Sequence, residues 1–469
     1  MTLRPPAITR RQLLRRGGAL GAGLAGASFL AACSATPGGN APSQPKAGKV
    51  TTDAARLGAV TLAQWDRFTK EAFPTRYAAL EQLRSEFQRK YPNIKITRVA
   101  KTTSELANIK LSLASSDGGP DVFALNNTGY SAAPLVKAGL LLNLDPYYTA
   151  YGWRKRIPAS LDAEGRYRAT GHWGDRTGHL YGSGLFLSYQ LLQYNKADVD
   201  KLGGLPKTFA DLEPYLAKAK QRGYTPFMIG LGSPQNGSHS GIYLAALLIM
   251  EKWGADNLRR WVYGQPGISL DTPEVIEALT TFQKWGRQGY FPANPAGLDP
   301  SSDVVTSFAK GTGVFHYNGM WLNPKIAPTM GDNFGQALPP GTHDGASGPT
   351  IATSAQLLAS AKTKHPDAVG AWLDFLISPR AATIFLSHGV LPSTFVNPAD
   401  APDEATKQSA QLAQKAFTSG NTASNLQGAW PTGAADQDAE LTLLLAGRKT
   451  PQQVAQAFDT YRKEFLSQL

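Results

Sequence analysis

Aromatic, amide and carboxylate side chains stand at the ends of predicted strands, and their types suit the binding of a ligand. Trp65 and Asp66 end the first predicted strand, and Trp321 follows a strand and the turn-prone pair Asn318-Gly319. Ligands of open α/β sheets lie beyond the carboxyl ends of the strands. A flat ring beside hydrogen-bonding groups suits a ligand that offers both apolar faces and polar groups.

Other candidates of these types lie in loops. Asn126 and Asn127 follow the third predicted strand, where paired amides can both donate to and accept from hydroxyl groups. The remaining candidates are Tyr181, Ser188, Ser233, Asn236 and Trp430. Loops held by rigid strands often carry binding groups. The alternative for the tryptophans is packing in a core, for Asp66 a loop cap, and for the others a turn or a solvated loop.

Catalysis is the rival class of function. None of the seven histidines forms H-E-x-x-H or another short ligand spacing, and no G-x-S-x-G occurs. His172 and His179, with Asp175 between them, come nearest to a cluster, but their glycine-rich surroundings are typical of a solvated loop. We therefore predict no metal, no cofactor and no enzymatic activity. Two alternatives stay open: a secreted carbohydrate-active enzyme with paired carboxylates and a passive adhesin of the cell envelope.

Residues 1–33 have the features of an export signal. They contain five arginines and no acidic residue, and their apolar stretch from Gly17 to Leu30 is shorter than the roughly 20 residues that span a bilayer. T-R-R-Q-L-L at 9–14 resembles a twin-arginine signal, and L-A-A-C at 30–33 resembles a bacterial lipobox. The lipobox implies cleavage before Cys33, lipid on its sulfur, and anchoring of the extracytoplasmic protein to the cell membrane. Whether export uses the twin-arginine or the general route stays open.

Composition predicts a folded domain behind a tether. Residues 34–58 are expected to be flexible, because Ser34 to Val50 is rich in Gly, Pro, Ser and Ala and lacks apolar periodicity. The chain is 42% hydrophobic and 17% charged, which is typical of a globular protein. Five of the positive charges behind the net charge of +12 lie in the signal, and the others are scattered. This pattern gives no sign of nucleic-acid binding.

Strand-like and helix-like segments alternate along residues 59–469, which predicts an α/β fold. The expected strands are 59–65, 94–96, 120–125 and 313–317. Apolar residues at helical spacing predict helices over 77–87, 106–113 and 132–141. Further helices are expected to be capped by Thr208, Thr272 and Thr450, the last two with proline at the first helical position.

Eight short motifs, each weak alone, follow one another in a fixed order. They are V-T-L at 60–62 before Trp65, G-P-D-V-F at 119–123, A-G-L-L-L-N-L at 138–144, L-Q-Y-N-K at 192–196, L-P-K-T-F-A-D-L at 205–212, F-A-K-G at 308–311 with N-G-M-W at 318–321, G-V-L-P at 389–392 and L-A-G-R-K-T-P at 445–451. Together they resemble the extracellular solute-binding proteins of ABC importers, the carbohydrate-binding family that includes maltose-binding protein. The chain departs from that pattern at Phe209 and Val314-Phe315, where Trp and Ala-Met are usual.

The resemblance implies a periplasmic-binding-protein-like fold of two α/β lobes joined by a hinge. Lobe one is expected at 59–186 plus 353–390, and lobe two at 187–352 plus 391–469. The ligand, a sugar or another small polar solute such as a glycerol-phosphate diester, would be trapped between the lobes as they close. Trp321 would stack on it, and Trp430 would be a second ring of the cleft. The partners implied are permease subunits of an ABC importer, and the protein is expected to be a monomer.

Overall fold

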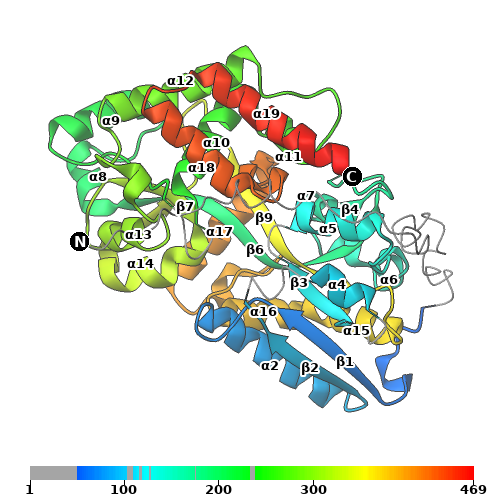
Figure 1. Cartoon of the computed structure of the whole chain (residues 1–469). Coiled ribbons are helices and arrows are strands. Elements are labelled where there is room, and N and C mark those ends of the chain that lie inside the picture. The colour runs from blue at the N-terminus through cyan, green and yellow to red at the C-terminus, as the bar shows by residue number, and fades with distance from the viewer. Residues whose placement is uncertain (1–49, 103–108, 116–118, 126–127, 175, 233–237) are drawn as a thin grey trace, which may run out of the picture. The chain divides into compact units, whose positions relative to one another are not determined.

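The computed structural model describes residues 50–102, 109–115, 119–125, 128–174, 176–232 and 238–469, which Figure 1 draws in colour. By its internal contacts the chain divides into Met1–Ala41 and Pro42–Leu469. The first unit, with the predicted signal and Cys33, lies outside the described residues. The fold described below is that of the second unit.

The main sheet has eight strands in the order β2-β1-β3-β9-β6-β7, with β10 beside β9 and β8 beside β6. Its strands are β1 (Val60–Asp66), β2 (Ile94–Ala100), β3 (Val122–Leu125), β6 (Gly182–Asn195), β7 (Phe315–Gly319), β8 (Phe334–Ala337), β9 (Thr350–Ala359) and β10 (Thr422–Ala423). A separate antiparallel pair is formed by β4 (Arg166–Tyr167) and β5 (His179–Leu180). Because β1 is parallel to both β2 and β3, the carboxyl ends of these three strands share one edge of the sheet.

The long strand β6 connects the two lobes. Its first part pairs with β9 from Gly182 to Tyr189, and its second part pairs with β7 and β8. β9 also pairs with β3 on its other side. Figure 1 shows β6 and β9 running side by side from the region of β1–β3 toward the helices around α10. The sheet therefore continues from one lobe into the other along β6 and β9.

The first lobe packs helices against β1 and β2. Side chains of β1 alternate between buried and accessible positions, which places Leu62 in the core. Leu80, Leu83 and Phe87 of α2 lie in the same core, where the Phe87 ring meets the Trp372 ring at 4.9 Å. The helices of this lobe are α2 (Pro74–Lys90), α4 (Ile109–Ala114), α5 (Thr128–Lys137), α6 (Asp145–Ala150), α7 (Ala159–Glu164), α15 (Pro366–Leu376) and α16 (Pro379–Ser387).

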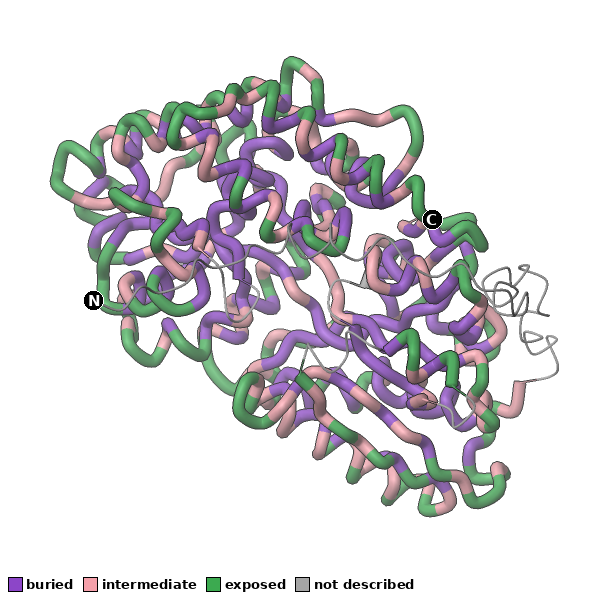
Figure 2. Tube along the Cα trace, viewed as in Figure 1, coloured by how far each residue is buried: buried purple, intermediate pink, exposed green. Residues whose placement is uncertain are grey.

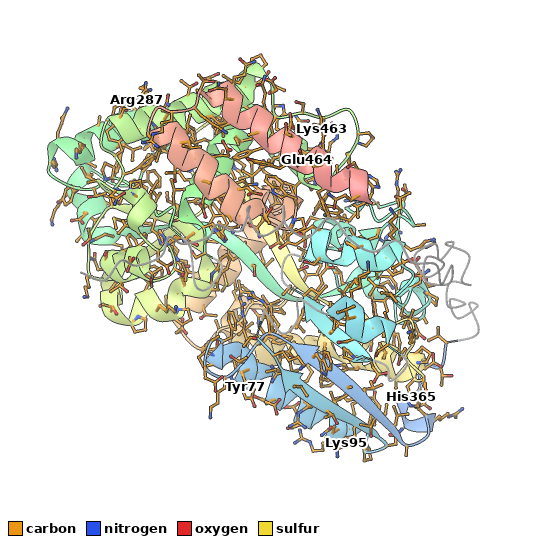
Figure 3. All side chains as sticks on the ribbon, in the orientation of Figure 1. Tyr77, Lys95, Arg287, His365, Lys463 and Glu464 are labelled. Atoms are coloured by element: carbon orange, nitrogen blue, oxygen red, sulfur yellow. The ribbon has the colours of Figure 1, made fainter. Side chains whose placement is uncertain are left out.

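The second lobe is built around α10 (Ser240–Trp253). All residues from Ser240 to Met250 are buried, as expected for a helix that is apolar on every side and surrounded by others. The outer helices are amphipathic: Figure 2 shows buried and exposed residues alternating along α19, and Figure 3 shows Lys463 and Glu464 on its outer face. The other helices of this lobe are α8 (Lys196–Leu202), α9 (Leu212–Gln221), α11 (Ala255–Val262), α12 (Pro273–Arg287), α13 (Asp303–Ala309), α14 (Asn323–Met330), α18 (Gly433–Leu445) and α19 (Pro451–Gln468). Helix α17 (Glu404–Ser419) follows in the chain but packs against the core of the first lobe.

The predicted helix starts are confirmed where a cap and a proline occur together. Thr272 caps α12, and Thr450 forms a capping box with Gln453 at the start of α19. The predicted start at Thr208 is wrong, because α9 begins at Leu212. The Thr208 side chain instead exchanges hydrogen bonds with Asp211 in a turn before the helix.

Two expectations about domain limits differ from the structure. Residues 50–58 were expected in the tether, but Ala54 is buried in the first lobe's core and Asn93 donates hydrogen bonds to the carbonyls of Ala54 and Leu57. Helix α17, expected in lobe two, packs Ala410, Ala413 and Ala416 into the core that contains β1. Across the described ranges no single helix is long and apolar enough to span a membrane; α15 and α16, bent by 56°, meet those limits only jointly.

Candidate ligand-binding site

A pocket of about 120 Å³ lies where β6 and β9 run between the two lobes. Side chains from both predicted lobes line it. From lobe one and β9 come Arg67, Phe73, Arg76, Leu125, Gly129, Glu164, Trp173, Thr353, Ser354, Ala355 and Gln356. From lobe two come Ser188, His239, Tyr243, Tyr263, Trp321, Ser424, Asn425, Gln427 and Gly428. Arg67 and Leu125 stand at the carboxyl ends of β1 and β3, where ligands of such sheets are held.

Trp321 supplies an aromatic wall of the pocket. It lies in the short helix η4 (Met320–Leu322) directly after β7. Its ring is only half-buried, although it packs against the core of each lobe and against a smaller apolar cluster that includes Phe308 and Ile326. The Tyr243 ring meets it edge-on at 6.4 Å. Gly319 permits this position, because a Cβ there would lie 2.0 Å from the Trp321 ring. The fold thus fixes a large flat ring while leaving part of its surface accessible.

Two glutamine side chains bring hydrogen-bonding groups to the pocket. Gln356 is 1% exposed and Gln427 is 4% exposed. Gln427 donates to the Tyr243 hydroxyl at 3.2 Å. Among the described residues, the Oε1 atoms of Gln356 and Gln427 have no hydrogen-bond partner. A buried polar atom without a partner is costly, so a hydrogen-bond donor of a ligand that reaches either oxygen would be stabilised there.

Glu164 is the carboxyl group in the pocket. It ends α7, and its Oε2 accepts from the Ser354 backbone at 2.8 Å and from the Ser354 hydroxyl at 3.0 Å. Burial raises the pKa of Glu164 to about 8, although these hydrogen bonds and one from Tyr263 oppose the shift. Glu164 is therefore mostly protonated at neutral pH and adds little negative charge to the pocket.

The structure brings two of the predicted site residues together in this pocket, Trp321 and Ser188. Trp65 and Tyr181 do not line it. The half-buried Trp65 ring carries the Lys101 ammonium 4.4 Å from its centroid, and the buried Tyr181 ring packs edge-on against Tyr167. Asn126, Asn127, Ser233 and Asn236 fall outside the described residues, so their predicted roles stay predictions.

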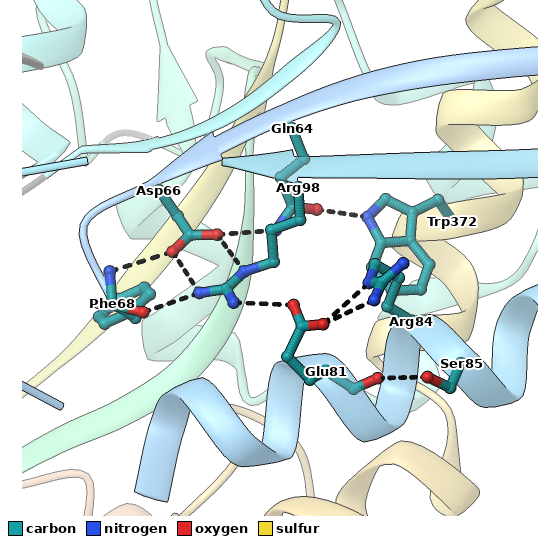
Figure 4. A network of polar contacts seen from close by, with 8 residues as sticks. All are labelled: Gln64, Asp66, Phe68, Glu81, Arg84, Ser85, Arg98 and Trp372. Atoms are coloured by element: carbon teal, nitrogen blue, oxygen red, sulfur yellow. Dashed lines mark hydrogen bonds and ion pairs between the residues drawn. The ribbon is translucent and has the colours of Figure 1, made fainter. Parts of the chain in front are cut away.

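Asp66 was predicted to bind the ligand, but in the structure it binds other residues of its own lobe. Its side chain is fully buried, and both of its oxygens accept from Arg98 at 2.7 Å. Gln64 and the Phe68 backbone donate to it as well, in the network of Figure 4. A carboxylate enclosed by donors of its own lobe has no surface left for a ligand, so Asp66 is a structural residue.

Trp430 also differs from the prediction. It is 2% exposed and packs among Trp261, Phe458 and Tyr461 in the core of the second lobe. Its indole N–H donates to Asp436 at 2.7 Å. The ring is therefore a core residue, and the aromatic partner of Trp321 in the pocket is Tyr243.

Most polar residues of the pocket were not predicted from the sequence. Arg76 had a signal, because it lies four residues before Leu80 and seven before Leu83, in line with the apolar stripe of α2. A charged residue in such a stripe indicates a buried charge. Glu164 and Tyr243 had no such signal. Glu164 ends α7 and Tyr243 lies in the buried helix α10, and their neighbours in the pocket come from distant parts of the chain.

A second cavity, of about 890 Å³, lies between α7, α11 and α17. It is larger, and its lining mixes apolar residues such as Leu187, Leu391 and Val396 with polar residues such as Ser393 and Gln414. Two of its three arginines have partners: Arg259 binds Asp256 and the Thr422 carbonyl, and Arg260 binds Gln265. The smaller pocket is taken as the candidate site because it contains Trp321 and Ser188 and is lined from both lobes.

The pocket has little of what hydrolysis requires. Glu164 is the only acidic residue among its described lining residues, whereas glycosidases of the paired-carboxylate kind need two. Within the described ranges, no three His, Cys, Asp or Glu side chains gather as they would around a metal ion. The groups present suit the binding of a solute.

Comparison with known proteins gives relatives of one kind. The chain is 25% identical over 343 residues to an uncharacterised ABC transporter extracellular-binding protein of Pyrococcus horikoshii, covering 70% of this chain and 71% of that one. It is 30% identical over 181 residues to a probable sugar-binding periplasmic protein of Brucella suis, covering 38% of each. Among solved structures, a chitin oligosaccharide binding protein matches with a TM-score of 0.68 at 18% identity, covering 87% of this chain and 99% of that one.

The structural match confirms the predicted two-lobed fold. The family model described as bacterial extracellular solute-binding protein matches residues 71–383, more than half of the chain. The match begins after β1 and contains β2, β3, β6, β9 and the pocket residues from Phe73 to Gln356. The chain belongs to the family of bacterial extracellular solute-binding proteins.

Proposed function

We propose that this protein captures a sugar, or a solute built on a sugar ring, outside the cytoplasm and delivers it to an ABC importer. The observation that carries the proposal is the pairing of a half-buried Trp321 ring with two buried glutamine oxygens that lack partners among the described residues. A sugar ring has an apolar face for the tryptophan and hydroxyl donors for the amide oxygens. The names of the sugar-binding relatives support the same ligand class.

The position of the pocket explains how binding is coupled to closure. Arg67 and Glu164 approach the ligand space from one lobe, and Tyr243 and Trp321 approach it from the other. A ligand that touches both lobes has more contacts when they are close together, so it favours the closed state. Delivery to permease subunits would use that state as its signal. The cavity volume of about 120 Å³ is of the scale of one small ring.

The test is a thermal-shift screen of residues 34–469 against mono- and oligosaccharides. A ligand present at 100 times its Kd stabilises the protein by about 2.7 kcal/mol. Chromatography of the recovered ligand should return it unchanged. Turnover of a sugar that binds would favour the enzyme instead, and a panel in which no sugar of any charge raises Tm would reject the proposal.

We also propose that Cys33 carries lipid and tethers the protein to the outer face of the cell membrane. The motif L-A-A-C at 30–33, behind the arginine-rich stretch, is the basis for this. Cys33→Ala should abolish fatty-acid labelling and release or misprocess the protein. Lysines in place of Arg10 and Arg11 should retain precursor in the cytoplasm if export uses the twin-arginine route. Size-exclusion chromatography should give a monomer.

A further inference from the structure

Two arginines of the pocket have no anionic partner among the residues that the structure describes. Arg67 follows directly after β1, and Arg76 lies in the first turn of α2; both line the same pocket as Trp321. Arg76 is 8% exposed, and Arg67 is half-buried. Within the part of the chain that the structure describes, neither guanidinium forms an ion pair or a hydrogen bond. Buried charges normally have partners, so this pair needs an explanation.

Aromatic rings hold both guanidinium groups in place. Arg67 lies 4.9 Å from the Phe73 ring centroid, and Arg76 lies 5.3 Å from that of Phe186 and 5.6 Å from that of Phe73. Cation–π contacts of this kind stabilise an arginine without using its N–H donors. The donors therefore remain available, in a fixed orientation, for a ligand.

The lowered pKa values of Arg67 and Arg76 also indicate cations without an anionic partner in the described residues. Burial lowers the pKa of Arg76 to about 9, and repulsion by the neighbouring Arg67 adds to the shift. Burial also lowers the pKa of Arg67 to about 10, with Tyr130 and Tyr243 opposing. Both groups are still cationic at neutral pH. The shifts mean that the unliganded protein holds these charges against desolvation and mutual repulsion, which an anion would relieve.

No other described charge in the pocket compensates them. Glu164 is mostly protonated at neutral pH, because burial raises its pKa to about 8. His239 faces Asp438, with Nδ1 and Oδ2 separated by 3.1 Å, and this pair can add at most one negative charge, which is fewer than the two positive charges of Arg67 and Arg76. The described lining therefore carries a net positive charge from Arg67 and Arg76.

We infer that the solute is an acidic sugar, whose carboxylate or phosphate group is bound by Arg67 and Arg76 while its ring contacts Trp321. Guanidinium groups suit these anions because their planar forks can donate two parallel hydrogen bonds to one group. This inference deepens the proposed function and rests on it for the sugar ring, but the anion site is testable by itself.

The experiment compares matched ligands by titration calorimetry on residues 34–469. Glucose is paired with glucuronate and glucose 6-phosphate, and galactose is paired with galacturonate; inorganic phosphate serves as an anion without a ring. We expect at least one acidic sugar to bind about 100-fold more tightly than its neutral counterpart, as two charge-assisted contacts require. Comparing the uronates with glucose 6-phosphate shows whether the site prefers a carboxylate or a phosphate.

Arg76→Gln and Arg67→Gln are the test variants, and Arg89→Gln is the control. Arg89 lies on the same helix α2, but its side chain is 76% exposed and distant from the pocket lining. We expect each test variant to lose about tenfold or more in affinity for the acidic sugar while neutral sugars change by less than about threefold. The control should match the native protein. If a glutamine variant does not fold, Arg76→Lys keeps the charge, removes the fork and should lose affinity for the acid.

The possible outcomes separate this inference from the proposed function. Tight binding of neutral sugars with none of the acids would overturn the acidic ligand and leave sugar capture intact. Phosphate binding that requires Arg67 and Arg76, without binding of any sugar, would support the anion site and reject sugar capture. Acid binding that survives both glutamine substitutions would also overturn the inference, and binding of nothing in the panel would overturn both.

Discussion

Arg98 and Arg76 are two buried arginines of the same lobe with opposite surroundings. The Arg98 side chain is 2% exposed and binds Asp66 with two hydrogen bonds of 2.7 Å and Glu81 with one of 3.0 Å (Figure 4). Burial alone would lower the pKa of Arg98, but Asp66 and Glu81 together raise it. Arg76 has rings around it and no described carboxylate, and its pKa is lowered.

The contrast separates charges that the fold compensates from charges that it leaves for a ligand. The Arg98 network ties β2 to β1 and α2, so its task is complete within the lobe. Arg76 lines the pocket, and its donors have no partner among the described residues. The tryptophans divide in the same way: Trp430 is enclosed and its N–H is bonded, whereas Trp321 keeps part of its ring accessible.

The largest effect is expected from breaking the compensated network. Asp66→Asn should lower the free energy of unfolding by about 3–5 kcal/mol, because it leaves a buried guanidinium undercompensated. The loss of unfolding free energy should fall near the lower end of this range, since Glu81 remains as an anionic partner of Arg98. Urea unfolding measures it, with the exposed residue Glu404 changed to Gln as the control, expected within about 0.5 kcal/mol of the native protein. A stable Asp66→Asn protein that has lost ligand affinity would return Asp66 to the site.

The next effect concerns the carboxyl group on the pocket side. Glu164 keeps its proton in the folded state up to a pKa of about 8, whereas its unfolded pKa is 4.5. Its contribution to stability is therefore fully present below pH 4.5 and is lost as the pH rises through 8. The loss amounts to no more than about 1.4 kcal/mol for each pH unit in this window.

Glu164→Gln should remove this pH dependence. The difference in unfolding free energy between variant and native protein should grow in favour of the variant as the pH rises from 4.5 to 8. Comparing the two proteins at each pH cancels other titrating groups, such as His316, whose pKa burial lowers to about 3. Parallel curves for the two proteins across this range would contradict the assignment.

For the tryptophan pair, the expected effect is divided between ligand binding and stability. Trp321→Ala should weaken ligand binding by about ten- to hundredfold, from lost stacking and lost burial. Its apo stability should fall much less than that of Trp430→Ala, for which removal of a core ring costs about 3–5 kcal/mol. Titration calorimetry of ligand binding and the apo Tm of both variants distinguish a ring of the pocket from a ring of the core. A Trp321→Ala protein that melts as low as Trp430→Ala yet binds normally would place Trp321 outside the site.

The sequence predicts the fold more fully than the site, and particular residues show why. Strand β1 and helices α12 and α19 follow from alternation, apolar spacing and Thr-Pro caps, which are local signals. Asp66 was misassigned because its partner Arg98 lies 32 residues away, and no local pattern pairs them. Whether a buried polar group has a partner depends on such long-range contacts. The places of Arg76 and Glu164 in the pocket could therefore be seen only in the folded structure. Trp321, which lines the pocket, could be proposed from the sequence because an ordered motif marks it.

The smallest change in stability is expected for Arg76→Gln, in the most direct comparison of the two arginines. Arg98→Gln leaves the buried Asp66 without its cation and should destabilise the apo protein by several kcal/mol, on the order of 3–5. Arg76→Gln leaves no described anion behind, and it removes both desolvation of a charge and repulsion from Arg67. The loss of cation–π contacts with Phe73 and Phe186 opposes this by about 0.5–2 kcal/mol. The two effects should nearly cancel, so apo Tm should stay constant or rise slightly. Urea unfolding of both variants without ligand measures the difference. An Arg76→Gln protein as unstable as Arg98→Gln would mean that the fold itself uses the charge of Arg76, and the distinction between compensated and ligand-facing arginines would fail.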